Sequence, residues 1–183
     1  MAVTAITLSS NALVLLGGQP IASFTDGESG SDIAALLYET TYHSMLTDTR
    51  WHFATRTVRL AQLLEKPENG FGFKFALPTD CLTVVKCSDR NYEIYERELY
   101  CHSSDVLIEY VYPVDEINLP AYFVKALEYN LAAQFAIPLT DNATKADFYY
   151  NLYQDFVKKA RFVDASQRPN SIIEDSPYIS ARR

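Results

Sequence analysis

The middle of this chain changes its hydrophobic period from helical to alternating and then back again. Phe71, Phe73 and Phe75 alternate with small or polar residues, which is the pattern of a β-strand with one buried face. On both sides of this region, apolar residues recur every three or four positions, as in amphipathic helices. The sequence therefore predicts two helices, several strands and two more helices, in that order.

Four helical segments are expected, at about residues 3–17, 30–50, 119–137 and 140–162. Gly17 or Gly18 ends the first, because glycine adopts the left-handed conformation at low cost. Pro138 ends the third, because proline lacks the N–H that would continue a helix.

The last two helical segments differ in how widely apolar residues are spread around them. In the third, large apolar residues step by four and alanines fill the space between, which favours a central position in a bundle. In the fourth, one apolar stripe lies next to another. These stripes are Phe148, Leu152 and Phe156, and beside them Tyr149, Tyr153 and Val157.

Residues 52–112 form the expected β region, an antiparallel sheet of about four or five strands. Residues 92–95 and 98–101 read as a hairpin around Glu96 and Arg97. The predicted fold class is α+β, mainly α: a four-helix bundle with a small antiparallel β insertion between the helix pairs. Residues 1–164 form a single domain, and residues 165–183 form an extended polar C-terminal tail.

The composition narrows the classes of partner. A hydrophobic content of 48% indicates a globular protein, and the net charge is −7 without any clustered lysines and arginines. Gripping duplex DNA requires a basic surface, so we expect DNA to pass this protein without specific binding. We expect no membrane contact, because no apolar run approaches the roughly 20 residues of a spanning helix. The first ten residues lack the basic start of a secretory signal.

No catalytic, cofactor-binding or metal-binding constellation stands out. The acidic segment 26–32 resembles a calcium loop, but Leu37 occupies the position where that loop needs a bidentate glutamate. The three histidines are far apart, and the three cysteines, which we expect to be reduced, form no CxxC pair. Cys101 precedes His102, yet adjacent strand residues point to opposite faces. We therefore predict that the chain is not an enzyme.

Short motifs along the chain point to one family. They are 15–21 (LLGGQPI), 26–28 (DGE), 50–54 (RWHFA), 75–82 (FALPTDCL), 108–110 (IEY), 123–127 (FVKAL) and 131–133 (LAA). In this order and spacing they resemble the head-to-tail adaptor (connector) proteins of tailed bacteriophages, and above all the tail tubular protein A family. The resemblance covers roughly residues 5–162.

The resemblance implies a structural virion protein of the neck, made in the host cytoplasm. Members of this family form a homo-oligomeric ring, commonly of twelve subunits, beneath the portal protein. The ring seals the DNA channel and carries the tail or nozzle protein. The implied fold, a helical bundle with a β-rich extension, agrees with the periodicity. A neck stopper or tail-completion protein is the alternative, and a small cytosolic thiol enzyme using Cys81 or Cys101 is a remote one.

Two sets of residues are the candidate contact sites. Tyrosine buries its ring while keeping its hydroxyl hydrated, so tyrosines of the β region are expected to contact the tail protein or a neighbouring subunit. These are Tyr92, Tyr95, Tyr100, Tyr110 and Tyr112. The resemblance implies that the C-terminal tail docks on the portal. Its apolar anchors and arginines are Arg168, Ile172, Ile173, Tyr178, Ile179, Arg182 and Arg183.

Overall fold

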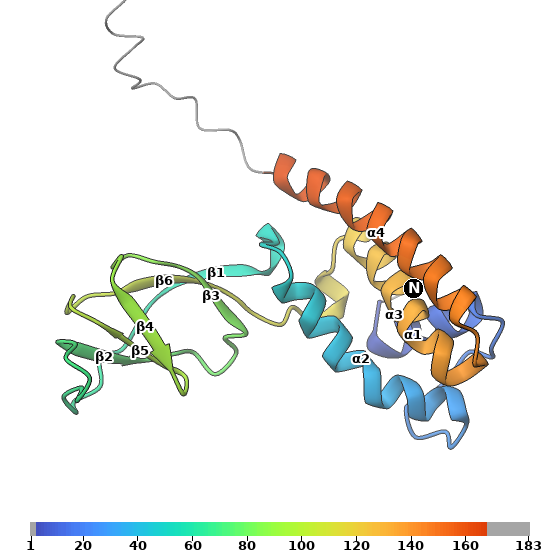
Figure 1. Ribbon diagram of the computed structural model, residues 1–183, viewed down its shortest axis with the longest axis horizontal. Helices are drawn as coiled ribbons and strands as arrows, with labels where there is room; N and C mark the ends of the chain where they lie inside the picture. The colour runs from blue at the N-terminus through green and yellow to red at the C-terminus, as the bar shows by residue number, and fades with distance from the viewer. Residues whose placement is uncertain (1–2, 168–183) are drawn as a thin grey trace, which may run out of the picture.

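The computed structural model describes residues 3–167, and these form two lobes (Figure 1). One lobe contains the helices α1 (Ala5–Leu15), α2 (Ser29–Thr47), α3 (Ala121–Thr140) and α4 (Ala143–Ser166). The other contains the strands β1 (Thr55–Arg59), β2 (Phe73–Ala76), β3 (Thr83–Cys87), β4 (Tyr92–Tyr95), β5 (Glu98–Cys101) and β6 (Leu107–Val111). The 3₁₀ turns η1 (His52–Ala54) and η2 (Glu116–Asn118) lie where the chain passes between the lobes.

The expected four-helix bundle is wrong. α3 contacts α1, α2 and α4, whereas α4 packs mainly against α3. About 48% of the residues are helical and 17% lie in strands of two separate sheets, so the fold is mixed α+β without a clean bundle. The physical reason is that apolar surface is unevenly distributed: α3 buries side chains on several sides, but α4 buries only one narrow stripe.

α3 is the centre of the helical lobe. Phe123, Leu127 and Phe135 are completely buried along it. Trp51, which follows α2, packs edge-on against Phe123 with ring centroids 5.1 Å apart. Pro138 does not end this helix, which continues to Thr140. A proline in the last turn removes only one of the helix's hydrogen bonds, and the helix ends instead where Asp141 adopts a φ of 47°.

α4 buries one of its two apolar stripes and leaves the other largely open to solvent. Tyr153, Val157 and Ala160 face α3 and are almost inaccessible to solvent. Phe148, from the other stripe, is 58% exposed, and Phe162 near the helix end is 77% exposed. α3 can cover only one side of α4, so the second apolar side stays open to solvent.

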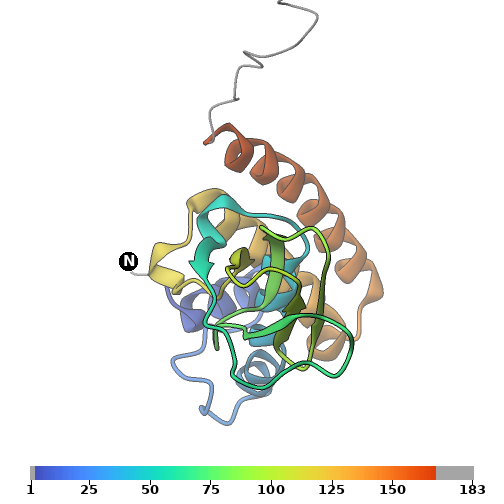
Figure 2. The same ribbon diagram turned by 90° about the vertical axis from the view of Figure 1, so that its left-hand side faces the viewer.

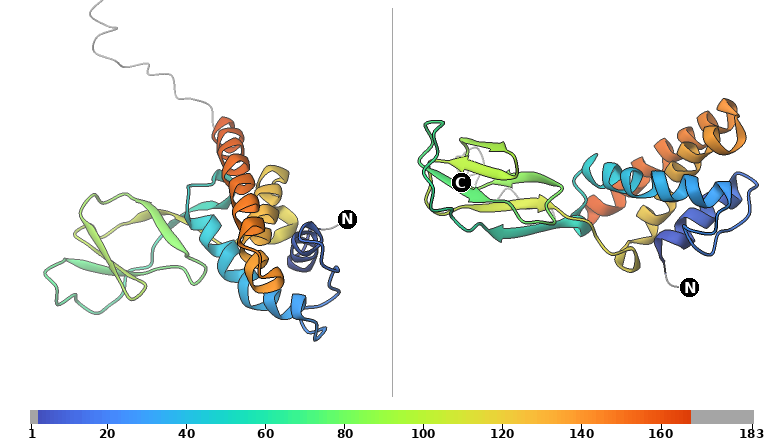
Figure 3. Two further views of the ribbon diagram at one scale, coloured as in Figure 1. Left: turned by 45° about the vertical axis from the view of Figure 1, so that its right-hand side comes forward. Right: turned by 90° about the horizontal axis from the view of Figure 1, so that it is seen from below.

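The β lobe consists of two three-stranded antiparallel sheets, where one sheet of four or five strands was expected. Their strand orders are β1-β6-β3 and β2-β5-β4. The inward side chains enclose a second core, in which Phe75 and Leu99 from one sheet meet Ile108 from the other. Seen from below, the sheets form one end of the molecule and the helices the other (Figure 3, right).

The predicted hairpin of β4 and β5 is confirmed. Tyr95 pairs with Glu98, and between them Glu96 and Arg97 have φ values of 46° and 70°. Two successive residues with positive φ give the turn the twist that a tight hairpin needs. The hairpin lies in the lobe that faces the viewer in Figure 2, while α4 runs outside the outline of that lobe.

Two adjacent serines of α1 allow a test of the helical core. The Ser9 hydroxyl is buried without a hydrogen-bond partner among residues 3–167, whereas Ser10 Oγ donates to the Ile21 carbonyl and accepts from the Ile21 N–H at 2.9 and 3.1 Å. We predict that Ser9→Ala raises the free energy of unfolding by about 1 kcal/mol, because an unsatisfied buried hydroxyl is removed.

Ser10→Ala is the matched control, because it makes the same change of helix propensity one residue away. It should lower the free energy of unfolding by about 1 kcal/mol, since the bonds to Ile21 are lost. Urea unfolding of both variants measures this. A shift of both midpoints in the same direction would contradict the prediction.

Each of the two cores contains side chains that report on its own packing, which allows a second test. Trp51 lies in the helical core, whereas Cys81, Cys87 and Cys101 lie in the β core. We predict that Phe75→Ala, which leaves a cavity costing about 3–5 kcal/mol, speeds the reaction of the thiols with an aromatic disulfide reagent and leaves Trp51 emission unchanged. Phe123→Ala should do the reverse. If both probes changed together in both variants, the lobes would form one cooperative unit.

Candidate functional site

Two of the five candidate tyrosines meet on the outer face of the sheet β2-β5-β4. The rings of Tyr95 and Tyr100 are 5.8 Å apart and nearly perpendicular. Their hydroxyls each donate to a glutamate of the same strand, Glu93 and Glu98, at 2.6 Å. These hydrogen bonds raise the pKa of both tyrosines. The pair presents aromatic surface to solvent with its hydroxyls fixed, as a contact site requires.

A groove of about 540 Å³ runs beside this pair. Its other wall is the loop 65–69, and Lys74 lies at its base. The Lys74 ammonium contacts Glu65 at 2.7 Å and Glu98 at 3.5 Å, and the hydrogen bond to Glu65 is the main cause of its raised pKa. The groove therefore combines aromatic walls with a neutralised charge cluster.

The other three tyrosines are placed differently. Tyr110 is buried in the β core, and its hydroxyl donates to Asp80 at 3.1 Å. Tyr92 packs against the same core. Tyr112 lies at the border of the lobes, where the Arg56 guanidinium covers its ring at 3.6 Å. The candidate contact surface on this outer face is therefore reduced to Tyr95 and Tyr100, and Tyr110 is excluded because its ring is inaccessible.

Exposed apolar side chains also occur towards both ends of α4, and the sequence analysis missed them. Phe148 is exposed near its start, and Phe162 and Val163 are exposed near its end. The half-buried Leu152 and the exposed Asp155 and Lys159 lie between them at helical spacing. One feature of the sequence could have revealed them: α4 carries two apolar stripes, and a neighbouring helix covers one.

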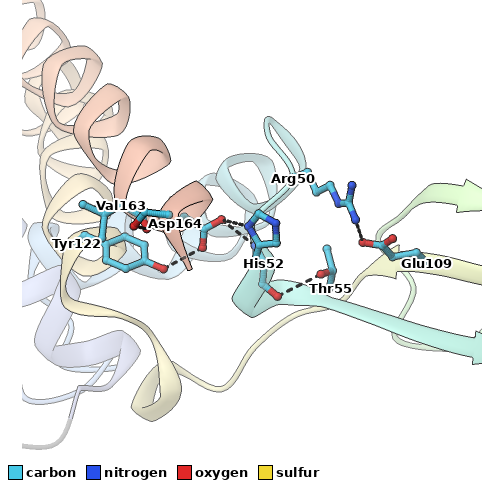
Figure 4. A network of polar contacts seen from close by, with 8 residues as sticks. Arg50, His52, Thr55, Glu109, Tyr122, Val163 and Asp164 are labelled. Atoms are coloured by element: carbon cyan, nitrogen blue, oxygen red, sulfur yellow. Dashed lines mark hydrogen bonds and ion pairs between the residues drawn. The ribbon is translucent and has the colours of Figure 1, made fainter. Parts of the chain in front are cut away.

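A buried carboxylate joins three segments at the junction of the lobes (Figure 4). Asp164, near the end of α4, has a side chain only 3% exposed. It accepts hydrogen bonds from the backbone N–H of His52 at 2.8 Å and from the Tyr122 hydroxyl at 2.9 Å, and its distance to His52 Nδ1 is 2.9 Å. Beside it, Arg50 pairs with Glu109 of β6, which links the end of α2 to the β lobe.

The thiols are poorly suited to catalysis. Cys81, Cys87 and Cys101 are all buried and form no disulfides, and burial raises the pKa of each thiol. A high pKa keeps a thiol protonated and unreactive near neutral pH. Cys101 directs its Sγ to the Ser103 carbonyl, while His102 stacks on Phe71. The adjacent cysteine and histidine therefore do not form a nucleophile–base pair.

In the described range, no group of three or more histidine, cysteine, aspartate or glutamate residues has the arrangement of a metal site. No helix within residues 3–167 has the length and apolarity needed to cross a bilayer. The candidate docking residues Arg168, Ile172, Ile173, Tyr178, Ile179, Arg182 and Arg183 all lie outside the described residues.

Comparison of the sequence with known proteins assigns no family to this chain. No protein-family model matches it, and no curated protein is significantly similar to it. The assignment of a function therefore depends on the motifs, the surfaces and the chemistry of the chain itself.

The hydrogen bond between Tyr122 and Asp164 at the junction of the lobes should make the free energy of unfolding depend on pH. Burial, and then the hydrogen bond to Asp164, raise the pKa of Tyr122 well above its usual value near 10. The folded state therefore keeps the proton after the unfolded state has lost it. This contribution to stability is complete below pH 10 and is lost as the pH rises above 10.

We predict that Tyr122→Phe lowers the free energy of unfolding at pH 8 by about 1.5–3 kcal/mol, because a hydrogen bond to a charged acceptor is lost. Between pH 10 and 11, the free energy of unfolding should fall less steeply with pH in the variant than in the natural chain. The two slopes should differ by at most about 1.4 kcal/mol per pH unit. This value is an upper limit because water reaches part of the Tyr122 ring. Chemical unfolding at each pH measures this. Equal slopes would show that folding does not raise the pKa of Tyr122.

Proposed function

We propose that this chain is a head-to-tail adaptor of a tailed bacteriophage, a structural subunit that assembles into a ring under the portal protein. The observation that carries the proposal is the set of ordered motifs that resemble those of that family. The RWHFA motif (50–54) forms the passage from α2 into β1 and includes the Asp164 partner His52. The FALPTDCL motif (75–82) connects the two sheets of the β lobe.

The distribution of exposed apolar side chains supports a subunit with several contacts. Phe148 and Phe162 lie open on α4 in one lobe, and Tyr95 lies open on the outer sheet of the other. Large aromatic side chains such as these contribute strongly to protein–protein interfaces when a partner covers them. In the proposed ring, α4 faces a neighbouring subunit, and the outer face of the sheet β2-β5-β4 faces the tail protein or another subunit.

The overall charge supports passage of DNA without binding. The chain carries 23 acidic and 16 basic residues. Within residues 3–167, several basic side chains, among them Arg50, Arg56 and Lys74, form ion pairs with carboxylates. A ring of such subunits repels the phosphate backbone, so DNA can move through it without being held. The proposed chain has no catalytic role.

The decisive experiment mixes the full chain with the portal protein of the same genome and images the product by electron microscopy. We expect a ring attached to the portal, with twelve subunits as the family implies. A chain ending at Gln167 should unfold at the same temperature, because the described fold ends there, but it should not attach to the portal.

A double variant, Phe148→Ser with Phe162→Ser, tests the α4 contact. Both side chains are exposed, so the melting temperature of the isolated subunit should change by less than about 2 °C, since surface substitutions stay within about 0.5 kcal/mol. Ring closure should be lost. Lys158→Ser, an exposed change on the same helix, is the control that should leave rings intact. Failure of the natural chain to bind the portal, or measured ATP hydrolysis that follows the protein through substitutions, would contradict the proposal.

A further inference from the structure

A groove of about 440 Å³ lies between α2 and the segment 113–116 that leads from the β lobe to α3. Its aromatic walls come from Phe24, Tyr38 and Tyr42. Ring centroids are 6.1 Å apart for Phe24 and Tyr38 and 5.9 Å apart for Tyr38 and Tyr42, so the three rings form a continuous series. The volume falls within the range of small-ligand sites, which is about 300–1,000 Å³.

The rim of this groove is acidic. Glu39 of α2 and Asp115 and Glu116 beside η2 all line it, and no lysine or arginine does. None of these three carboxylates forms an ion pair within the described part of the chain. His43 completes the rim. Negative charge therefore converges on an aromatic surface without any internal cation to balance it.

Hydrogen bonds hold the walls of the groove in place. The Tyr38 hydroxyl donates to Glu116 Oε1 at 3.2 Å, and the Tyr42 hydroxyl donates to the Val114 carbonyl. Burial and the charge of Glu116 raise the pKa of Tyr38, so this hydroxyl remains a donor. Both bonds tie the segment 113–116 to α2. A ligand would meet a site that is already formed, which lowers the entropic cost of binding.

We propose that this groove binds the guanidinium group of an arginine side chain presented by a different protein. A guanidinium stacks on aromatic rings and forms forked hydrogen bonds with carboxylates. The groove offers the half-buried ring of Phe24 for stacking, backed by the buried rings of Tyr38 and Tyr42, together with the carboxylates of Glu39, Asp115 and Glu116. A lysine ammonium is a compact, strongly hydrated charge and uses such a combination less well.

Charge favours a different protein over a second copy of this chain at this groove. Each copy carries a net charge of −7, so the surface of another copy complements an acidic groove less well than a basic segment does, whereas apolar contacts between copies elsewhere are unaffected. A basic segment of a different protein has the complementary charge and is steered towards the groove. This binding site goes beyond the proposed adaptor role, since it does not depend on ring formation.

The test is a titration of the full ¹⁵N-labelled chain with acetyl-Gly-Arg-Gly amide, followed by the backbone amide shifts of Glu39, Asp115 and Glu116. We expect saturable shifts with this peptide and none with the peptide containing citrulline, which keeps the shape of arginine without its charge. Glu39→Gln and Glu116→Gln should each raise the dissociation constant about two- to fivefold, as for a partly exposed charge pair.

Two further variants test whether the effect is specific to the carboxylates of this groove. Asp115→Asn repeats the test at a carboxylate whose oxygens form no hydrogen bond in the described range, so the bonds of Tyr38 and Tyr42 that hold the walls of the groove remain in place. Glu68→Gln, which changes an exposed glutamate of the groove beside Tyr95, should leave the affinity unchanged.

The proposal is overturned by any of four results. Equal binding of the citrulline peptide would remove the role of charge, and equal or tighter binding of acetyl-Gly-Lys-Gly amide would remove the preference for arginine. An effect of Glu68→Gln as large as that of Glu116→Gln would indicate unspecific attraction. The same shifts on adding unlabelled chain without peptide would assign the groove to a second copy.

Discussion

The buried carboxylate of Asp164 is the interaction on which the arrangement of the two lobes depends. It accepts hydrogen bonds from His52 and Tyr122 and so joins the end of α4 to the passage into the β lobe and to the start of α3. A buried charge is tolerated only when several donors surround it. The need to satisfy this carboxylate therefore fixes the position of η1, and with it the point at which β1 leaves the helical lobe.

How far the sequence predicts this fold depends on the range of the interactions involved. The β4–β5 hairpin was predicted correctly because the alternation and the turn at Glu96 and Arg97 are local. The division into two sheets was not, because it follows from the pairing of β1 with β6, which are distant in sequence. α4 shows the same limit: periodicity located its two apolar stripes, but only the position of α3 determines which stripe is buried.

The candidate surfaces follow the same rule. Tyr110 shares the side of its strand with Ile108, a core residue, while Tyr95 and Tyr100 share theirs with glutamates, so alternation within the strands could have separated them. The acidic groove could not be predicted, because Tyr38 and Glu116 are brought together by the return of the chain from the β lobe. No pattern in either segment indicates that they meet.

The pairing of β1 with β6 also has a consequence for the order in which the molecule folds. Thr55 faces Val111 across the first rung of this ladder, so the ends of the inserted lobe lie side by side. The helices on either side of the insertion must find each other across a long segment, and the entropy lost on closing a loop grows with its length. A β lobe that forms first brings α2 and α3 together as though a short connection joined them. The inserted lobe then lowers the loop-closure entropy that the pairing of α2 with α3 costs.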